Sequence, residues 1–331
     1  MKAILVENYG GSDQLQLTEV PQPEISPVDI LIKLEAAGVN FVDVYERSGV
    51  YSNLQLPYIP GKEGAGVVVG KGEMVKNFAI GDQVAFPYID CGSYAEYVAI
   101  PASQAVALPA EIDFITGAGC LLQGLTAHFL THDTFRLGTE HIALIHAAAG
   151  GVGLLAVQMA KLRGATVIGT VSTETKAQMV KQAGADYVIR YDQEDFVSAV
   201  MHWTDGVGVD VVYDSVGLAT FNGSLQILKN RGLAVMFGQS SGMVPAVNLN
   251  SQLGNRDKAR GSFYVTRPVI RHYIANEVAL KSRADEFFNY IITEKVKVLI
   301  GHQYDLSNAK KAHNDLEKRL TVGKSILRIH F

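Results

Sequence analysis

The feature that most constrains this fold is an apolar run that ends in small residues and leads directly into a helical pattern. It lies at residues 141–153, HIALIHAAAGGVG, and the helical pattern continues to residue 165. This strand–turn–helix order is typical of a dinucleotide-binding βαβ unit. Glycines let the backbone approach a pyrophosphate, and the helix N-terminus offers N–H groups and the positive end of its dipole. The stretch therefore predicts a dinucleotide site.

The glycine pattern departs from the usual GxGxxG. Ala148 stands at the first glycine position, so the string is better described as AxxGxxG from Ala147 through Gly150 to Gly153. Alanine fits a tight turn where its φ stays negative. An ordinary strand–loop–helix junction is the alternative, but the alternation of strands and helices around the turn favours the dinucleotide.

From about residue 131 onward, apolar runs alternate with helical patterns. Strands are predicted at 142–147, 166–171, 187–189, 210–213, 233–237 and 261–265. Six strands with intervening helices predict an α/β fold, a doubly wound parallel Rossmann sheet with right-handed crossovers.

The first third of the chain is instead rich in short β-type runs separated by Gly and Pro. This pattern predicts a small barrel or sandwich-like domain, followed by a mostly helical segment at 111–131. The tail predicts helices at 284–294 and 308–319 and a strand at 324–330, which could pair back into the first domain.

The length, the net charge and the number of cysteines narrow the class of protein further. A length of 331 residues predicts about two domains. With a net charge of −4 and no long basic run, a nucleic-acid partner is not expected. Two cysteines indicate a reducing compartment. Residues 141–160 lack charged side chains, but a buried strand followed by a half-buried helix explains them better than a membrane span.

The end of the second predicted strand bears on the choice of cofactor. NAD-specific sites usually place an acid there, but this chain has Ser172 at that position and Lys176 four residues later. A hydroxyl and an ammonium suit a 2′-phosphate, and Tyr191 could cover the adenosine end. Glu174 argues mildly against phosphate, and Lys176 could be a solvated first-turn residue. We expect NADPH rather than NADH.

Two segments of the first domain, GVNFVD (38–43) and the glycine-rich stretch at 61–82, resemble the medium-chain dehydrogenase/reductase superfamily. Its zinc alcohol dehydrogenases carry a Cys near Asn40 and a His at the position of Lys62. A catalytic zinc needs about three side-chain ligands, and a structural zinc commonly uses four cysteines. The resemblance, taken with these departures, implies metal-free chemistry.

In lacking these zinc ligands, the chain is similar to the quinone oxidoreductase branch of the superfamily, which includes the zeta-crystallins. The strings that carry this resemblance are AAGVNFVDVYERSGVY (36–51), HAAAGGVG (146–153), VVYDSVG (211–217) and FYVTRP (263–268). The resemblance covers nearly the whole chain. It implies a discontinuous GroES-like catalytic domain (1–125 and 267–331) around a Rossmann NADPH-binding domain (126–266), in a homodimer.

The resemblance also implies roles for individual residues. Asn40, Tyr45 and Tyr51 would line the catalytic cleft, with packing as the alternative for the two tyrosines. The expected cofactor contacts are Phe41, Tyr45, Thr126, Gly150, Gly151, Val152, Ser172, Lys176, Tyr191, Ser215, Phe237, Ser240, Val265 and Arg319. Phe237 and Val265 could instead be plain core, and Arg319 a surface charge.

The implied activity is reduction of a quinone or a related conjugated electrophile by NADPH in the cytoplasm. An NADPH-dependent alkenal or enone reductase is the enzymatic alternative, because the same cofactor geometry serves a C=C bond. The alternative of another class is a nucleotide-binding, crystallin-like structural or RNA-binding protein.

Overall fold

The computed structural model describes residues 1–52, 54–254 and 259–329. The chain forms two compact units, the first comprising Met1–Leu125 with Ile274–Phe331 and the second Thr126–Tyr273. Each unit has its own apolar core. Within the described residues, no helix has both the length and the apolar character that crossing a bilayer requires.

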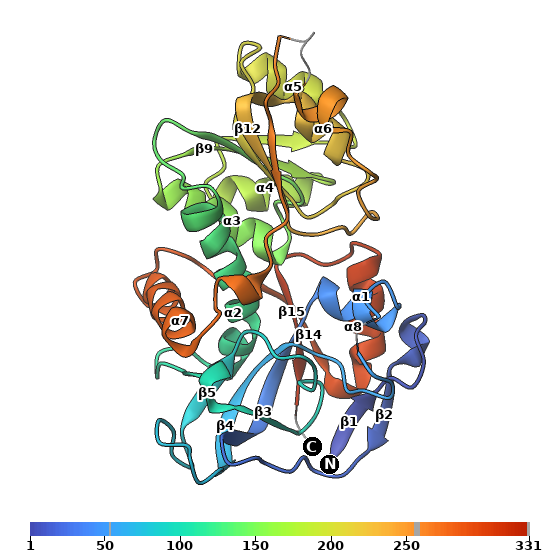
Figure 1. Ribbon diagram of the computed structural model, residues 1–331, viewed down its shortest axis with the longest axis vertical. Helices are drawn as coiled ribbons and strands as arrows, with labels where there is room; N and C mark the ends of the chain where they lie inside the picture. The colour runs from blue at the N-terminus through green and yellow to red at the C-terminus, as the bar shows by residue number, and fades with distance from the viewer. Residues whose placement is uncertain (53, 255–258, 330–331) are drawn as a thin grey trace. The chain divides into compact units, whose positions relative to one another are not determined.

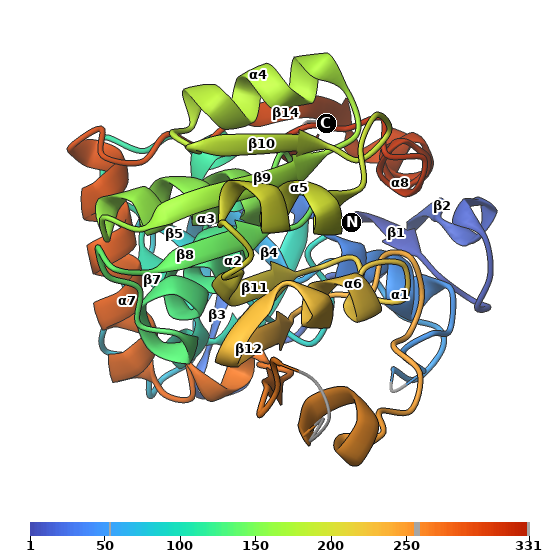
Figure 2. The same ribbon diagram turned by 90° about the horizontal axis from the view of Figure 1, so that it is seen from above.

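The second unit contains the six-stranded parallel sheet that the sequence predicts. Its strands lie in the order β10-β9-β8-β11-β12-β13, and those labelled in Figure 2 follow this order. This is the order of a doubly wound dinucleotide-binding sheet. The strands are β8 (Ile142–Ile145), β9 (Thr166–Val171), β10 (Tyr187–Arg190), β11 (Val209–Asp214), β12 (Leu228–Met236) and β13 (Tyr264–Thr266).

The helices of this unit follow its strands, as crossover helices must. They are α3 (Gly151–Leu162), α4 (Glu174–Gln182), α5 (Phe196–Trp203) and α6 (Phe221–Gln226), with short π and 3-10 turns at η3 (Leu130–Thr134), η4 (Leu249–Gly254) and η5 (Ile270–His272). Helix α3 buries Leu155 and Met159, because its apolar residues recur at helical spacing on one face. The sequence predicted intervening helices but no bounds for α5 and α6.

The first unit is built on a seven-stranded sheet in the order β14-β15-β3-β4-β5-β7, with β6 pairing β3, and a separate β1-β2 hairpin. The strands are β1 (Lys2–Leu5), β2 (Gln16–Glu19), β3 (Asp29–Val39), β4 (Glu63–Lys71), β5 (Gln83–Phe86), β6 (Tyr97–Pro101), β7 (Val106–Ala107), β14 (Ile300–Asp305) and β15 (Lys324–Arg328). The C-terminal strand β15 pairs antiparallel with β3, with Ser325 opposite Val39. The two strands are drawn in red and blue in Figure 1. The predicted return of the tail is therefore confirmed, although its last predicted residue, His330, lies outside the described residues.

The described part of the first unit also contains four α-helices, counting α2, which continues into the second unit. They are α1 (Phe41–Arg47), α2 (Phe114–Phe129), α7 (Glu277–Ile292) and α8 (Ala309–Glu317), with 3-10 turns at η1 (Ser12–Gln14), η2 (Ala102–Gln104) and η6 (Leu306–Asn308). Helix α2 carries the chain into the second unit, and α1 packs against α8. The sequence predicted α2, α7 and α8 approximately and missed α1, β2 and β14.

Candidate functional site

The glycine turn of the second unit lies between β8 and α3. Ala147 takes a left-handed conformation, with φ of 51°, and Gly150 is the N-cap of α3 without a side-chain capping bond. The first helical bond joins the Leu154 amide to the Gly150 carbonyl over 2.9 Å. The amides of residues 151–153 therefore have no helical acceptor, which leaves them available to an anion.

Gly153 allows the helix to approach the turn. A Cβ there would lie 2.5 Å from the carbonyl oxygen of Ala147 and 2.8 Å from the carbonyl carbon of Ala148. No side chain fits at such distances, so this position requires glycine. The geometry suits the pyrophosphate of a dinucleotide, and the predicted contacts of Gly151 and Val152 with one remain predictions.

Beneath the turn lies a buried polar network around His146. Its Nδ1 contacts the Thr170 hydroxyl at 3.0 Å and its Nε2 contacts the Ser224 hydroxyl at 3.1 Å. Burial lowers the pKa of His146, while the charge of Asp214 opposes this shift. Since the Thr170 carbonyl also accepts from the Ala148 amide at 3.1 Å, a neutral His146 ties the turn to the sheet. Sequence reasoning did not single out this histidine.

The carboxyl ends of β9 and β10 bring together the residues predicted for the adenosine phosphate. Ser172 follows β9, Thr173 caps α4 by accepting from the Lys176 amide at 3.3 Å, and the Tyr191 amide donates to the Val171 carbonyl at 3.1 Å. Ser172 and Lys176 are half-buried and Tyr191 is exposed. The three residues therefore lie at the carboxyl ends of neighbouring strands. Helix α4 packs against these strands, β9 and β10, as Figure 2 shows.

Residues that follow β11 and β12 form a second group at the carboxyl edge. The Ser240 amide donates to the Ser215 carbonyl at 3.1 Å, and the Phe237 amide donates to the Asp214 carbonyl at 2.9 Å. Val265 lies on β13, opposite Ala234. The structure thus brings Ser215, Phe237 and Ser240 together.

The remaining predicted cofactor residues lie on separate elements. Thr126 lies in the part of α2 that belongs to the second unit. Arg319 belongs to the first unit, where it follows α8 with φ of 60°. Their contacts with a cofactor remain predictions.

In the first unit, Asn40 is held by a buried ion pair. Its Nδ2 donates to Glu63 Oε1 at 2.8 Å, and its Oδ1 accepts from Lys324 Nζ at 2.8 Å. Lys324 and Glu63 also form a direct salt bridge, and the Leu122 amide donates to Glu63 Oε2 at 2.9 Å. Because both ends of the amide are engaged, its orientation is fixed. The sequence missed this pair, although a charged residue at the start of the apolar strand KSILR was a usable signal.

Lys62, the position of the zinc-ligating histidine in the resemblance, is also buried in an ion pair. Its Nζ lies 2.7 Å from Glu46 Oε1, donates to the Asp90 carbonyl and faces the Tyr88 ring, 5.5 Å from its centroid. An ammonium repels a divalent cation and Asn40 supplies an amide already in use. These residues do not fit a catalytic zinc.

A third buried polar cluster links α1 to α8 through the Tyr94 hydroxyl. The Tyr94 hydroxyl donates to Asp43 Oδ2 at 2.9 Å and lies 3.1 Å from His313 Nε2. Burial raises the pKa of Asp43 to about 7, with the negative charge of Glu46 adding to the effect. Burial lowers the pKa of His313 to about 3, and the charge of Arg47 adds to that shift. The Asp43 carboxyl also accepts from the backbone N–H of Asn40 at 2.8 Å. This bond fixes the start of α1.

The aromatic residues predicted for the cleft form a cluster on and after α1. The Phe41 and Tyr45 rings are 5.8 Å apart, and the Tyr45 and Tyr51 rings meet edge to face at 5.2 Å. The Tyr51 amide donates to the Tyr45 carbonyl at 3.0 Å. All three side chains are half-buried. The structure therefore brings them together, and their roles toward substrate remain predictions.

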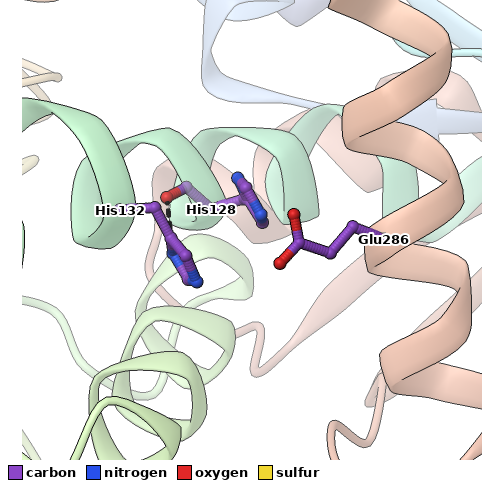
Figure 3. Close-up of side chains that lie close together, drawn as sticks. All are labelled: His128, His132 and Glu286. Atoms are coloured by element: carbon purple, nitrogen blue, oxygen red, sulfur yellow. Dashed lines mark hydrogen bonds between the residues drawn. The ribbon is translucent and has the colours of Figure 1, made fainter.

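His128, near the end of α2, and His132, in the following turn η3, both belong to the second unit (Figure 3). The rings of His128 and His132 stack with centroids 4.1 Å apart. The Nδ1 of His132 donates to the His128 carbonyl at 3.0 Å, which satisfies a carbonyl at the helix end. This arrangement stabilises the end of the helix that carries Thr126.

The chain is similar to known proteins in both sequence and structure. Residues 26–110 match the model of the alcohol dehydrogenase GroES-like domain, and residues 151–280 match that of the zinc-binding dehydrogenase. Quinone oxidoreductase 1 of Escherichia coli is 42% identical over 96% of this chain and 97% of its own. The 2-haloacrylate reductase of a Burkholderia species is 34% identical over 98% of both chains. A structure of E. coli quinone oxidoreductase complexed with NADPH superposes with a TM-score of 0.95, at 40% identity, over 99% of this chain and all of that one.

Proposed function

This chain belongs to the quinone oxidoreductase family of the medium-chain dehydrogenases/reductases, and we propose that it reduces quinones with NADPH as the electron donor. The observation that carries the proposal is the similarity over nearly the whole chain, combined with a glycine cradle suited to a pyrophosphate. The E. coli relative was solved with NADPH.

The residues suited to hold NADPH lie at the carboxyl edge of the parallel sheet. The amides of Gly151 and Val152 would bind the pyrophosphate, and Ser172, Lys176 and Tyr191 would surround the adenosine phosphate. When bound, NADPH supplies the reducing equivalents. The protein's contribution is to position the acceptor and to stabilise the negative charge that develops on its oxygen.

The chemistry proposed for the first unit uses no metal. Tyr45 and Tyr51 carry hydroxyl groups that can donate to a quinone oxygen. Asn40 is oriented by Glu63 and Lys324, so its amide offers a fixed dipole at the start of α1. The ion pair of Lys62 with Glu46 supports zinc-independent chemistry, although one matched family model is named for zinc binding.

We propose that the protein is a homodimer formed through the sheet of the second unit. Strand β13 is an edge strand, and its Tyr264 and Val265 are 59% and 37% exposed. An exposed apolar edge can pair with a second copy. We also propose a cytoplasmic location, which the two free cysteines, Cys91 and Cys120, support.

A reductase of conjugated C=C bonds is the second candidate, which the 34% identity to 2-haloacrylate reductase favours. The experiment that tests the proposal compares kcat/KM for NADPH oxidation across quinones, alkenals, enones and 2-haloacrylate. We expect the quinones to give the highest values. A higher kcat/KM for an unsaturated acid or enone would favour the second candidate, and no turnover with any acceptor would contradict both. A mainly RNA-binding role is not favoured, because the net charge is −4.

A further inference from the structure

Arg190 is a cation of the second unit that neither the sequence analysis nor the proposed NADPH site uses. It ends β10, where it pairs in register with Val171, the last residue of β9. The next residue, Tyr191, donates its amide to the Val171 carbonyl. Arg190 therefore lies at the same edge as Ser172 and the first turn of α4.

The Arg190 guanidinium is held by two carboxylates of unequal geometry. Asp192 makes two contacts, from Oδ2 to Nη2 at 2.8 Å and from Oδ1 to Nε at 3.3 Å. Glu174 makes one, from Oε2 to Nη1 at 3.2 Å. The Glu174 contact is therefore the one that yields more readily. Its other oxygen accepts from the Gln178 amide at 3.4 Å, so the carboxylate keeps a partner when the guanidinium leaves.

Glu174 also occupies a telling position along the chain. It is the first residue of α4 and follows the end of β9 by three residues. An acid after the second strand of such a fold accepts from the ribose hydroxyls of NADH, whereas an arginine nearby accommodates the 2′-phosphate of NADPH. One ion pair thus joins the groups suited to the two cofactors.

We propose that Arg190 binds the 2′-phosphate of NADPH and that Glu174 competes for its guanidinium, so that Glu174 limits the preference for NADPH over NADH. The inference rests on the proposed function. Exposed ion pairs such as this one contribute little, and a phosphate carries more charge than a carboxylate. Replacing the Glu174 carboxylate by the phosphate as a partner of Arg190 is therefore favourable. The carboxylate still opposes phosphate binding, because it competes for the guanidinium and repels the phosphate.

The test measures the Kd of NADPH and of NADH by titration calorimetry on the full-length protein and four variants. Glu174→Gln should tighten NADPH about three- to tenfold and leave NADH unchanged or weaker, since removing one like charge near a phosphate has an effect of this order. Arg190→Gln should weaken NADPH about tenfold and spare NADH. In the double variant, the gain from Glu174→Gln should disappear.

The matched control is Glu194→Gln, which removes one charge from an exposed side chain near the end of β10 that forms no ion pair with Arg190 in the described part of the chain. It should change neither Kd. Weaker NADPH binding by Glu174→Gln, an equal gain in the Glu194→Gln control, or a gain that persists without Arg190 would overturn the inference while NADPH binding by the unmodified protein stands. Failure of the unmodified protein to bind NADPH would instead overturn the proposed function, and this inference with it.

Discussion

Asp43 makes the stability of the first unit depend on pH in an unusual direction. Its carboxyl is fully buried on α1 and accepts from the Asn40 amide and the Tyr94 hydroxyl through one oxygen, Oδ2. The charges that act on it are those of Glu46 and Lys62. Replacement by asparagine keeps an oxygen acceptor and removes the ionisable group.

The magnitude follows from the pKa. Burial raises the pKa of Asp43 from 3.8 to about 7. Between these values the folded protein keeps the proton and the unfolded chain has released it, so the contribution of Asp43 to the unfolding free energy falls as pH rises. The slope is about 1.4 kcal/mol per pH unit, which amounts to about 4 kcal/mol over the whole window. The loss is absent below the unfolded pKa and complete above the folded one.

The assay is urea unfolding followed by circular dichroism, for the unmodified protein and Asp43→Asn, between about pH 5 and about pH 7. The unfolding free energy of the unmodified protein should fall relative to that of the variant by about 1.4 kcal/mol per pH unit. Tyr94→Phe removes a hydroxyl that lowers the pKa of Asp43, so the fall of its unfolding free energy relative to Asp43→Asn should extend to higher pH. Parallel pH profiles for the unmodified protein and Asp43→Asn would refute the reasoning.

Three further predictions concern the turn, the ion pair and the metal. Gly153→Ala places a Cβ 2.5 Å from the Ala147 carbonyl oxygen, so calorimetry should show that NADPH and NADH both bind at least about tenfold more weakly; unchanged binding would contradict the close approach. Lys324→Met leaves Glu63 charged and buried, and denaturant unfolding should show a loss of about 3–5 kcal/mol. Adding Glu63→Gln should restore part of it, and equal losses in the single and double variants would argue against the pair. Metal analysis should find no stoichiometric zinc, and chelators should leave turnover intact; the opposite result would mean that ligands other than Asn40 and Lys62 hold a metal.

The sheet of the second unit was predictable because each βα unit is local in sequence. The runs at 142–147 and 166–171 identified β8 and β9, and the small residues between β8 and α3 identified the turn. The sequence could also place Ser172 and Lys176 after a strand end. It did not show that Ala147 would take the left-handed conformation, since only the backbone reveals which alanine turns.

The first unit was harder to predict because its polar core is assembled over long distances in sequence. Lys324 and Asn40 are 284 residues apart and meet only because β15 pairs with β3. Helix α1 is seven residues long, too short for a periodic pattern. Its one local signal was Asn40 followed three residues later by Asp43, the spacing of a capping box.

The site residues likewise include some whose meeting could be predicted from the sequence and others whose meeting could not. Ser215, Phe237 and Ser240 follow consecutive strands of a parallel sheet, so their meeting at one edge could be foreseen. The ion pair of Arg190 with Glu174 joins a strand end to a helix start that precedes it by sixteen residues. Only the parallel register of β9 and β10 brings these two side chains together.

The most direct test of the central claim is quinone-dependent oxidation of NADPH by the purified protein, compared with NADH under the same conditions. The account predicts turnover that requires the quinone, with a kcat/KM at least about tenfold higher for NADPH than for NADH, because the 2′-phosphate gains charge-assisted contacts. An absence of quinone-dependent oxidation, or equal kcat/KM for the two cofactors, would contradict it.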